Sequence, residues 1–264
     1  MFTPLISASI TQKLIFRQNV MRPLRVSFLL NRWFLVALLL PDVLALGSTA
    51  ASLLFPGVSL TVDPTEASIF EFLGNSLPKD QLATLSRSVT ELPMHPFLLV
   101  LLGGTIAGLT INGIAGFGEE LGWRGLLLRE LAGLGFWRAS FTIGLIWGLW
   151  HLPFILHGYN YPGYPIAGVF MMIVWTVLFS PLIAYVSIRS NSVIPAAIMH
   201  GALNGTAMAP AIVLKGGDAL QVGVMGFAGM LVLFCFNVAL LVLCKPTEWH
   251  NKWMERTLDS AAHP

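Results

Sequence analysis

Residues 97–125 read FLLVLLGGTIAGLTINGIAGFGEELGWRG and combine an apolar run of membrane-spanning length with three ionisable side chains at its end. About 20 mainly apolar residues are enough for a helix to cross a bilayer. Glu119, Glu120 and Arg124 follow this run within two turns. An ionisable side chain costs roughly 2.5–3.5 kcal/mol or more at the centre of a membrane helix. The stretch therefore predicts a membrane helix that leads into polar residues retained for pairing or for chemistry.

The whole chain has the composition of a membrane protein. Its 264 residues are 55% hydrophobic and 11% charged, with a mean hydropathy of +0.75. An ordinary soluble domain is about 25% charged. The net charge of +2 is too small to suggest binding to nucleic acid. We therefore expect membrane lipid as a partner and no nucleic acid.

Apolar stretches of spanning length predict an all-α fold, a polytopic transmembrane helical bundle of about six to eight membrane helices. The segment 118–136 mixes charged residues with leucines and glycines. It fits either a helix at the membrane edge or a seventh, polar helix packed within the bundle. The six main spans are expected at 33–56, 97–117, 139–156, 166–188, 192–214 and 221–243.

Lysine and arginine residues predict the orientation, because cytoplasmic loops carry more of them than loops on the opposite side. They precede the first span and follow the second, fourth and sixth, whereas the remaining loops hold few. We expect a multi-pass protein of the cell (inner or plasma) membrane with both termini cytoplasmic, and a short interfacial helix at 70–77. The expected organisation is a cytoplasmic segment 1–32, one transmembrane domain 33–244 with an external loop 57–96 and an active-site core 97–208, and a cytoplasmic tail 245–264.

The first motif separates two neighbouring carboxylates. On a helix, Glu120 and Arg124 are four residues apart with the glutamate first, which is the better order for an ion pair. Glu119 points about 100° away from that pair. It is therefore the better candidate for a general base, and Glu120 with Arg124 is expected to support it. The alternative is a structural salt bridge with Glu119 facing solvent.

Two further motifs lie on later apolar segments. Trp147-x-x-x-His151 is followed by Pro153, which can kink or end its helix. His200 and Asn204 share one helical face. Alone, the first of these motifs is more typical of a histidine hydrogen-bonded to a neighbouring helix, and the second is equally typical of a polar contact between helices. Three such clusters in one small bundle favour a functional site.

In order along the chain, Glu-Glu-x-x-x-Arg, aromatic-x-x-x-His and His-x-x-x-Asn resemble the CPBP intramembrane metalloprotease family. That family contains the type II CAAX prenyl endopeptidases and the bacteriocin-immunity (Abi-like) proteins. The resemblance covers about residues 97–208, with one departure, since the family usually has Phe where this chain has Trp147. It implies a membrane endopeptidase acting on peptide or protein substrates, lipidated or not. The residues it implies as catalytic are Glu119, His151, His200 and Asn204, with Glu120, Arg124 and Trp147 in support.

The chemistry expected of these residues is attack by an activated water on a peptide carbonyl. Glu119 would take the proton of the water, and His200 with Asn204 would stabilise the oxyanion. The sequence leaves a Zn²⁺ cofactor open: Glu119, His151 and His200 match the ligand set of a catalytic zinc site. No His-Glu-x-x-His helix is present in the sequence.

This mechanism requires the site residues to approach one point, and the small residues beside them predict that the helices come close enough. These are Gly118, Gly122, Gly148, Gly201 and Ala202. Two other functions remain open from the sequence. One is a non-enzymatic membrane immunity or interaction protein of the same fold. The other is a proton-coupled transporter, for which an internal repeat would be typical and is not evident.

Overall fold

A computed structural model describes residues 1–70 and 77–262, with side chains described up to residue 255. The chain forms an all-α bundle, as the composition predicts. Within the described residues its sheet consists of two short strands, which pair antiparallel with Ser59 opposite Lys215 and Leu60 opposite Leu214. The expected short helix at 70–77 falls almost entirely outside the described residues.

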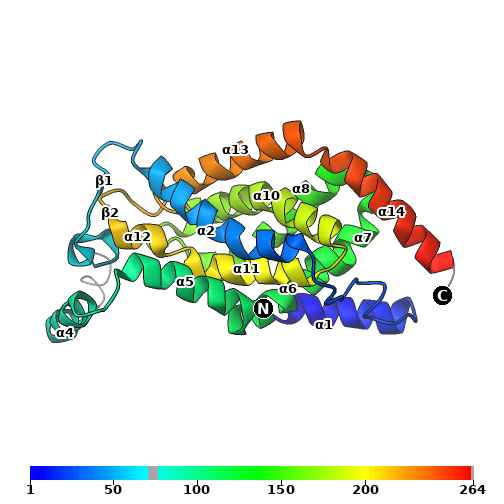
Figure 1. The fold of residues 1–264 in the computed structure, drawn as a ribbon, viewed down its shortest axis with the longest axis horizontal. Coiled ribbons are helices and arrows are strands. Elements are labelled where there is room, and N and C mark those ends of the chain that lie inside the picture. Colours follow the sequence, from blue (N-terminus) through cyan, green and yellow to red (C-terminus); the bar gives the residue numbers. More distant parts are fainter. Residues whose placement is uncertain (71–76, 263–264) are drawn as a thin grey trace.

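Figure 1 shows the order of the elements along the chain, in which the longest connections that lie within the described residues are 16–31 and 216–226. Apart from the two strands and two short 3-10 turns (Pro64–Glu66 and Ala132–Leu134), the regular elements that the structure describes are α- or π-helices. Their bounds are α1 Thr3–Ile10, η1 Thr11–Ile15, α2 Arg32–Ser52, β1 Ser59–Leu60, α4 Lys79–Thr90, α5 Pro96–Leu109, α6 Ile111–Glu120, η3 Leu121–Leu127, α7 Leu128–Glu130, α8 Phe136–Trp150, α9 Leu152–Leu156, α10 Pro165–Ser190, α11 Ile194–Thr206, α12 Ala209–Val213, β2 Leu214–Lys215, α13 Phe227–Leu243 and α14 Pro246–Ala262.

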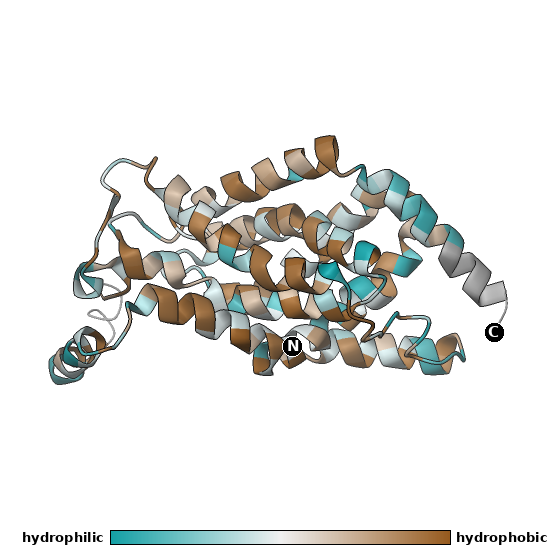
Figure 2. Cartoon of the chain, in the orientation of Figure 1, coloured by the Kyte–Doolittle hydropathy of each residue, from teal (hydrophilic) through white to brown (hydrophobic). Residues whose placement is uncertain are grey.

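The bundle is built around α10 and α11. Helix α10 packs against α8 and α13, and α11 packs against α2, α5 and α6. Figure 2 shows hydrophobic residues along the length of the bundle and hydrophilic residues concentrated toward its ends, on α4 and α14. An apolar exterior with polar ends is the pattern expected of a helical bundle in a bilayer.

Fewer helices cross the bundle unbroken than the sequence predicts. By length and composition, three described helices could span a membrane, namely 32–52, 165–190 and 194–213, or up to five if each of two bent pairs is one span. The chain bends by 56° between α5 and α6, and by 69° between α13 and α14. The expected span 139–156 is divided at His151 into α8 and the short α9, because Pro153 lies in the first turn of α9 and cannot continue α8. Apolar length alone does not reveal such breaks.

The first residues of the chain form a helix that the sequence analysis did not anticipate. Helix α1 lies along α6 and η3 and continues into the π-helical turn η1; Pro4 and Ala8 of α1 are buried. On the opposite face, Ile6, Ile10 and Leu14 are exposed. The apolar residues of this segment come in short runs separated by polar ones, so the sequence pattern did not indicate a helix here.

Glycines let α11 approach its neighbours to backbone contact. A Cβ atom on Gly104 of α5 would lie 2.5 Å from the carbonyl carbon of Gly205, and one on Gly201 would lie 2.5 Å from the carbonyl carbon of Asn112. Both distances are below any normal van der Waals contact. The sequence predicts that Gly118 and Gly122 also allow the helices of the site to approach one another. In the structure these two glycines instead contact the start of the chain, at Phe2 and at Pro4 of α1.

Gly104 and its neighbour Gly103 offer a matched test of this close packing. Gly104→Ala forces α5 away from α11, and overpacking of this kind typically costs about 1–3 kcal/mol. Gly103→Ala adds a methyl group where no atom lies within 4 Å. We expect a lower unfolding temperature for Gly104→Ala in detergent and no loss for Gly103→Ala. Equal unfolding temperatures for the two variants would contradict the close approach of these helices.

Candidate active site

The Glu-Glu motif lies where α6 gives way to a wider turn of helix. Residues Leu121–Leu127 form a π-helix, a departure from α-helical geometry that is frequent at functional sites. Both Glu119 and Glu120 are buried, with exposed fractions of 2% and 0%. The alternative in which Glu119 faces solvent therefore does not hold in this structure. Segment 118–127 packs within the bundle and does not lie at its surface.

Glu120 and Arg124 form a buried ion pair. The Nη1 of Arg124 donates to both carboxylate oxygens of Glu120, at 3.1 and 3.0 Å, and both side chains are fully buried. The Nη2 of the same guanidinium donates to Ser180 Oγ of α10 at 3.1 Å. This pair is the one that the four-residue spacing predicts. Its link to α10 was not foreseen, since a single serine before Pro181 in an apolar span gives no such signal.

His200 joins the same ion pair from α11. Its Nδ1 lies 2.8 Å from Glu120 Oε1. Because Glu120 is paired with a guanidinium, the carboxylate accepts and the imidazole Nδ1–H donates. The neutral form of His200 then carries its lone pair on Nε2. Two motifs that are 80 residues apart in the chain thus meet at one carboxylate.

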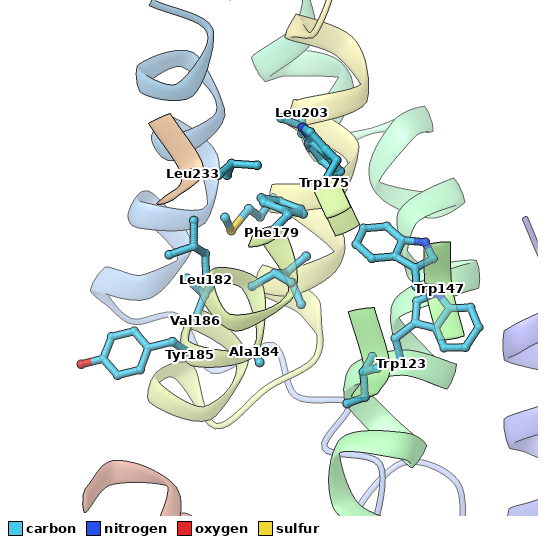
Figure 3. Close-up of a cluster of buried hydrophobic side chains, with 14 of the residues drawn as sticks. Trp123, Trp147, Trp175, Phe179, Leu182, Ala184, Tyr185, Val186, Leu203 and Leu233 are labelled. Atoms are coloured by element: carbon cyan, nitrogen blue, oxygen red, sulfur yellow. The ribbon is translucent and has the colours of Figure 1, made fainter. Parts of the chain in front are cut away.

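Trp147 holds the other carboxylate. Its indole Nε1–H donates to Glu119 Oε2 at 3.0 Å, a bond that a phenylalanine at this position could not make. The ring also lies 4.9 Å from the Arg124 guanidinium carbon and 5.2 Å from the His200 ring. Trp147 belongs to the buried hydrophobic cluster of Figure 3, where its ring centroid lies 6.2 Å from that of Phe179 of α10.

His151 and Asn204 lie at the edge of this cluster. His151 caps α8, with Nδ1 2.9 Å from the carbonyl oxygen of Trp147, so this nitrogen is the donor and Nε2 carries the lone pair. The ring is half-buried and lies within electrostatic range of both Glu119 and His200. Asn204 is exposed one turn beyond His200 and makes no side-chain hydrogen bond to any described residue.

The donor set of a zinc site is present, but its arrangement is not. The Nε2 atoms of His151 and His200 with the carboxylate of Glu119 are of the type that binds zinc. Across residues 1–70 and 77–255, however, no three His, Cys, Asp or Glu side chains are grouped so that they could hold an ion. The residues as arranged do not fit a bound metal.

Another intramembrane carboxylate lies on α2. Thr105 Oγ1 of α5 donates to Asp42 Oδ2 at 2.8 Å, which ties the two helices together. Asp42 makes no hydrogen bond to the residues of the three motifs, so its observed partner is structural.

A comparison with known protein families gives one match to this part of the chain. The family model of the type II CAAX prenyl endopeptidase Rce1-like proteins matches residues 94–206, a range that contains all three motifs. The match confirms the resemblance to the CPBP and CAAX protease family. At the level of the family it supports a membrane-embedded endopeptidase. No significant match to a curated protein or to a solved structure was found.

The two glutamate–arginine pairs of this region provide a test of the buried one. Glu120→Gln leaves Arg124 buried without its anion, and breaking such a pair typically costs about 3–5 kcal/mol. Glu130→Gln breaks the ion pair with Arg129. The Glu130 side chain is 42% exposed, and exposed pairs contribute about 0–1 kcal/mol. We expect a large fall in the unfolding temperature for Glu120→Gln and little change for Glu130→Gln. Comparable shifts would contradict the structural role of the Glu120–Arg124 pair.

Proposed function

We propose that the chain is an intramembrane endopeptidase that hydrolyses peptide bonds through a water activated by Glu119. The observation that carries the proposal is the division between the two carboxylates. Glu120 is committed to Arg124 and His200, whereas Glu119 is held by a single indole N–H and has an oxygen left for a proton. A general base needs an available lone pair in a defined position. The family match supports the endopeptidase class.

The reaction follows from these contacts. Glu119 takes a proton from water as the water oxygen attacks the carbonyl carbon of the substrate. The carbonyl oxygen becomes an oxyanion, which accepts hydrogen bonds from Asn204 and from His200. Because Nδ1–H of His200 is directed at Glu120, His200 donates from Nε2 only as the imidazolium. Glu119 then passes its proton to the leaving nitrogen, and the carbon–nitrogen bond breaks to give a carboxyl and an amine.

His151 and Asn204 are proposed to act on the substrate rather than on the buried residues. Both are accessible at the edge of the cluster, where a peptide can reach them. Membrane lipid and a peptide or protein substrate are the partners that the family supports. A lipid anchor on the substrate is a further proposal, because an anchored chain would already lie in the plane of the bilayer.

Zn²⁺ at Glu119, His151 and His200 stays a prediction from the sequence. A bound zinc ion would polarise the carbonyl and acidify the water. None of the steps above depends on it. Metal analysis of the purified protein and of Glu119→Gln tests it directly, since a bound ion should decrease in the variant.

The proposed orientation has both termini on the cytoplasmic side of the cell membrane. The arginines and lysines of the first 32 residues, of α7 and of the start of α14 support it. The competing function is a non-enzymatic immunity or interaction protein of the same fold. In that function the buried polar residues would serve only to pack the helices. It does not explain why Glu119 is buried outside the Glu120–Arg124 ion pair.

Glu119→Gln tests the catalytic base. The amide oxygen of glutamine can still accept from Trp147, so we expect the folded protein to be retained while hydrolysis is lost. Activity is measured on a substrate selected from a peptide library with the protein in detergent or vesicles. Glu130→Gln is the control for removal of a carboxylate from the neighbouring turn. Near wild-type turnover in Glu119→Gln would contradict the assignment of Glu119 as the catalytic base and favour the non-enzymatic function.

Trp147→Phe tests how the base is positioned. The phenyl ring retains an aromatic contact with Phe179 and His200 but cannot donate to Glu119 Oε2. A hydrogen bond to a charged group contributes about 1.5–3 kcal/mol, which corresponds to a rate loss of roughly tenfold or more. We expect kcat to fall by this order and KM to change little. An unchanged kcat would mean that the indole N–H has no part in positioning the base.

A further inference from the structure

A basic, aromatic pocket lies at the end of the bundle where α2 begins and where α10 and α13 end. It has a volume of about 480 Å³. Its basic lining residues are Arg32, Arg189 and Lys245, and its aromatic and apolar lining includes Trp33, Trp249 and Leu243. None of these residues belongs to the three motifs of the candidate active site.

Arg189 is held in this pocket by aromatic rings rather than by an acid. Its guanidinium carbon lies 3.6 Å from the ring centroid of Trp249 and 4.7 Å from that of Trp33. Its Nη1 donates to the hydroxyl of Tyr185 at 2.6 Å. Among the described side chains, no carboxylate lies within salt-bridge distance of Arg189. The guanidinium is therefore fixed in place with its charge unneutralised and with N–H donors left for a ligand.

The charges around Arg189 have the same sign. Arg32 and Lys245 line the pocket, and Lys252 lies 5.1 Å from the ring of Trp249. Among the described residues, the acid paired with this group is Glu248, 3.2 Å from Lys245, and both side chains of that pair are more than half exposed. Two arginines and Lys252 thus remain without an acidic partner among the described residues. Such a pocket attracts an anion.

The pocket also has an apolar side. Val36 and Leu243 line it, and both are exposed, with Leu243 at 76%. They belong to α2 and α13, whose outer faces are apolar along their length (Figure 2). A ligand that fits has an anionic group at the end of the bundle and hydrocarbon along these helices. Basic residues with tryptophans at a membrane interface are the chemistry that recognises anionic lipid headgroups.

We propose that this pocket binds the phosphate headgroup of an anionic phospholipid. Arg189 and Arg32 hold the phosphate, Lys245 contributes at the rim, and one acyl chain lies on Val36 and Leu243. Guanidinium groups suit phosphate oxygens because they donate two parallel hydrogen bonds. The site is independent of the proposed hydrolysis, because it shares no residue with the motifs that carry it.

The test measures lipid retained by the full chain in detergent. Native mass spectrometry follows the titration of dioctanoyl phosphatidylglycerol, dioctanoyl phosphatidylcholine and inorganic phosphate. We expect selective retention of phosphatidylglycerol. The double variant Arg32→Gln, Lys245→Gln changes two exposed side chains and should weaken this binding about fivefold for each basic residue removed. The matched control, Lys79→Gln with Arg87→Gln, removes the same charge from α4 and should leave binding unchanged.

Arg189→Lys adds a second measurement that keeps the charge but removes the planar group between the two tryptophans. We expect this variant to bind phosphatidylglycerol more weakly. Its unfolding temperature, measured in the absence of lipid, shows whether packing is lost as well. Equal retention of the two lipids, or equal weakening in the α4 control, would overturn the site. Inorganic phosphate that binds as tightly as phosphatidylglycerol would overturn the lipid assignment.

Discussion

A guanidinium keeps its charge under all physiological conditions, so Arg124 can be buried in an apolar bundle only with a fixed anion beside it. Glu120 supplies that anion from the preceding turn. The remaining contacts of the pair come from three other helices, through Ser180, Trp147 and His200. The need to neutralise one buried charge thus fixes where α8, α10 and α11 meet the Glu motif.

This arrangement also explains why two adjacent glutamates differ in role. The carboxylate oxygens of Glu120 are bound to Arg124 and His200, and these contacts hold helices together. Removal of the carboxylate would leave the buried guanidinium of Arg124 without its anion. Among the described residues, the side chain of Glu119 has one hydrogen-bond partner, the indole of Trp147. The ion pair is the rigid support and the neighbouring carboxylate is the group left for chemistry, a division that preorganised sites require.

The sequence predicts the local part of this site and not the long-range part. Periodicity alone predicts that Glu120 pairs with Arg124 and that Glu119 points away, because both follow from 3.6 residues per turn. The contact of His200 with Glu120 spans 80 residues, and no local rule relates them. Apolar length predicts the all-α fold, and Pro153 indicates a break near His151, but no residue of the sequence indicates the break at Thr110. Asn204 shares a helical face with His200 as expected, yet burial separates the two side chains.

The contact of Phe2 with Gly118 has a consequence for how the protein is made. The first residues leave the ribosome long before the helix they dock on, which follows about 115 residues later. Until α6 and η3 are in the membrane, α1 has no partner for its buried face, and its apolar residues are exposed to whatever surrounds it. A contact of such large separation also closes a long loop of chain, and the entropy cost of that closure slows its formation. The Glu motif therefore receives its N-terminal cover only after the rest of the bundle has begun to assemble.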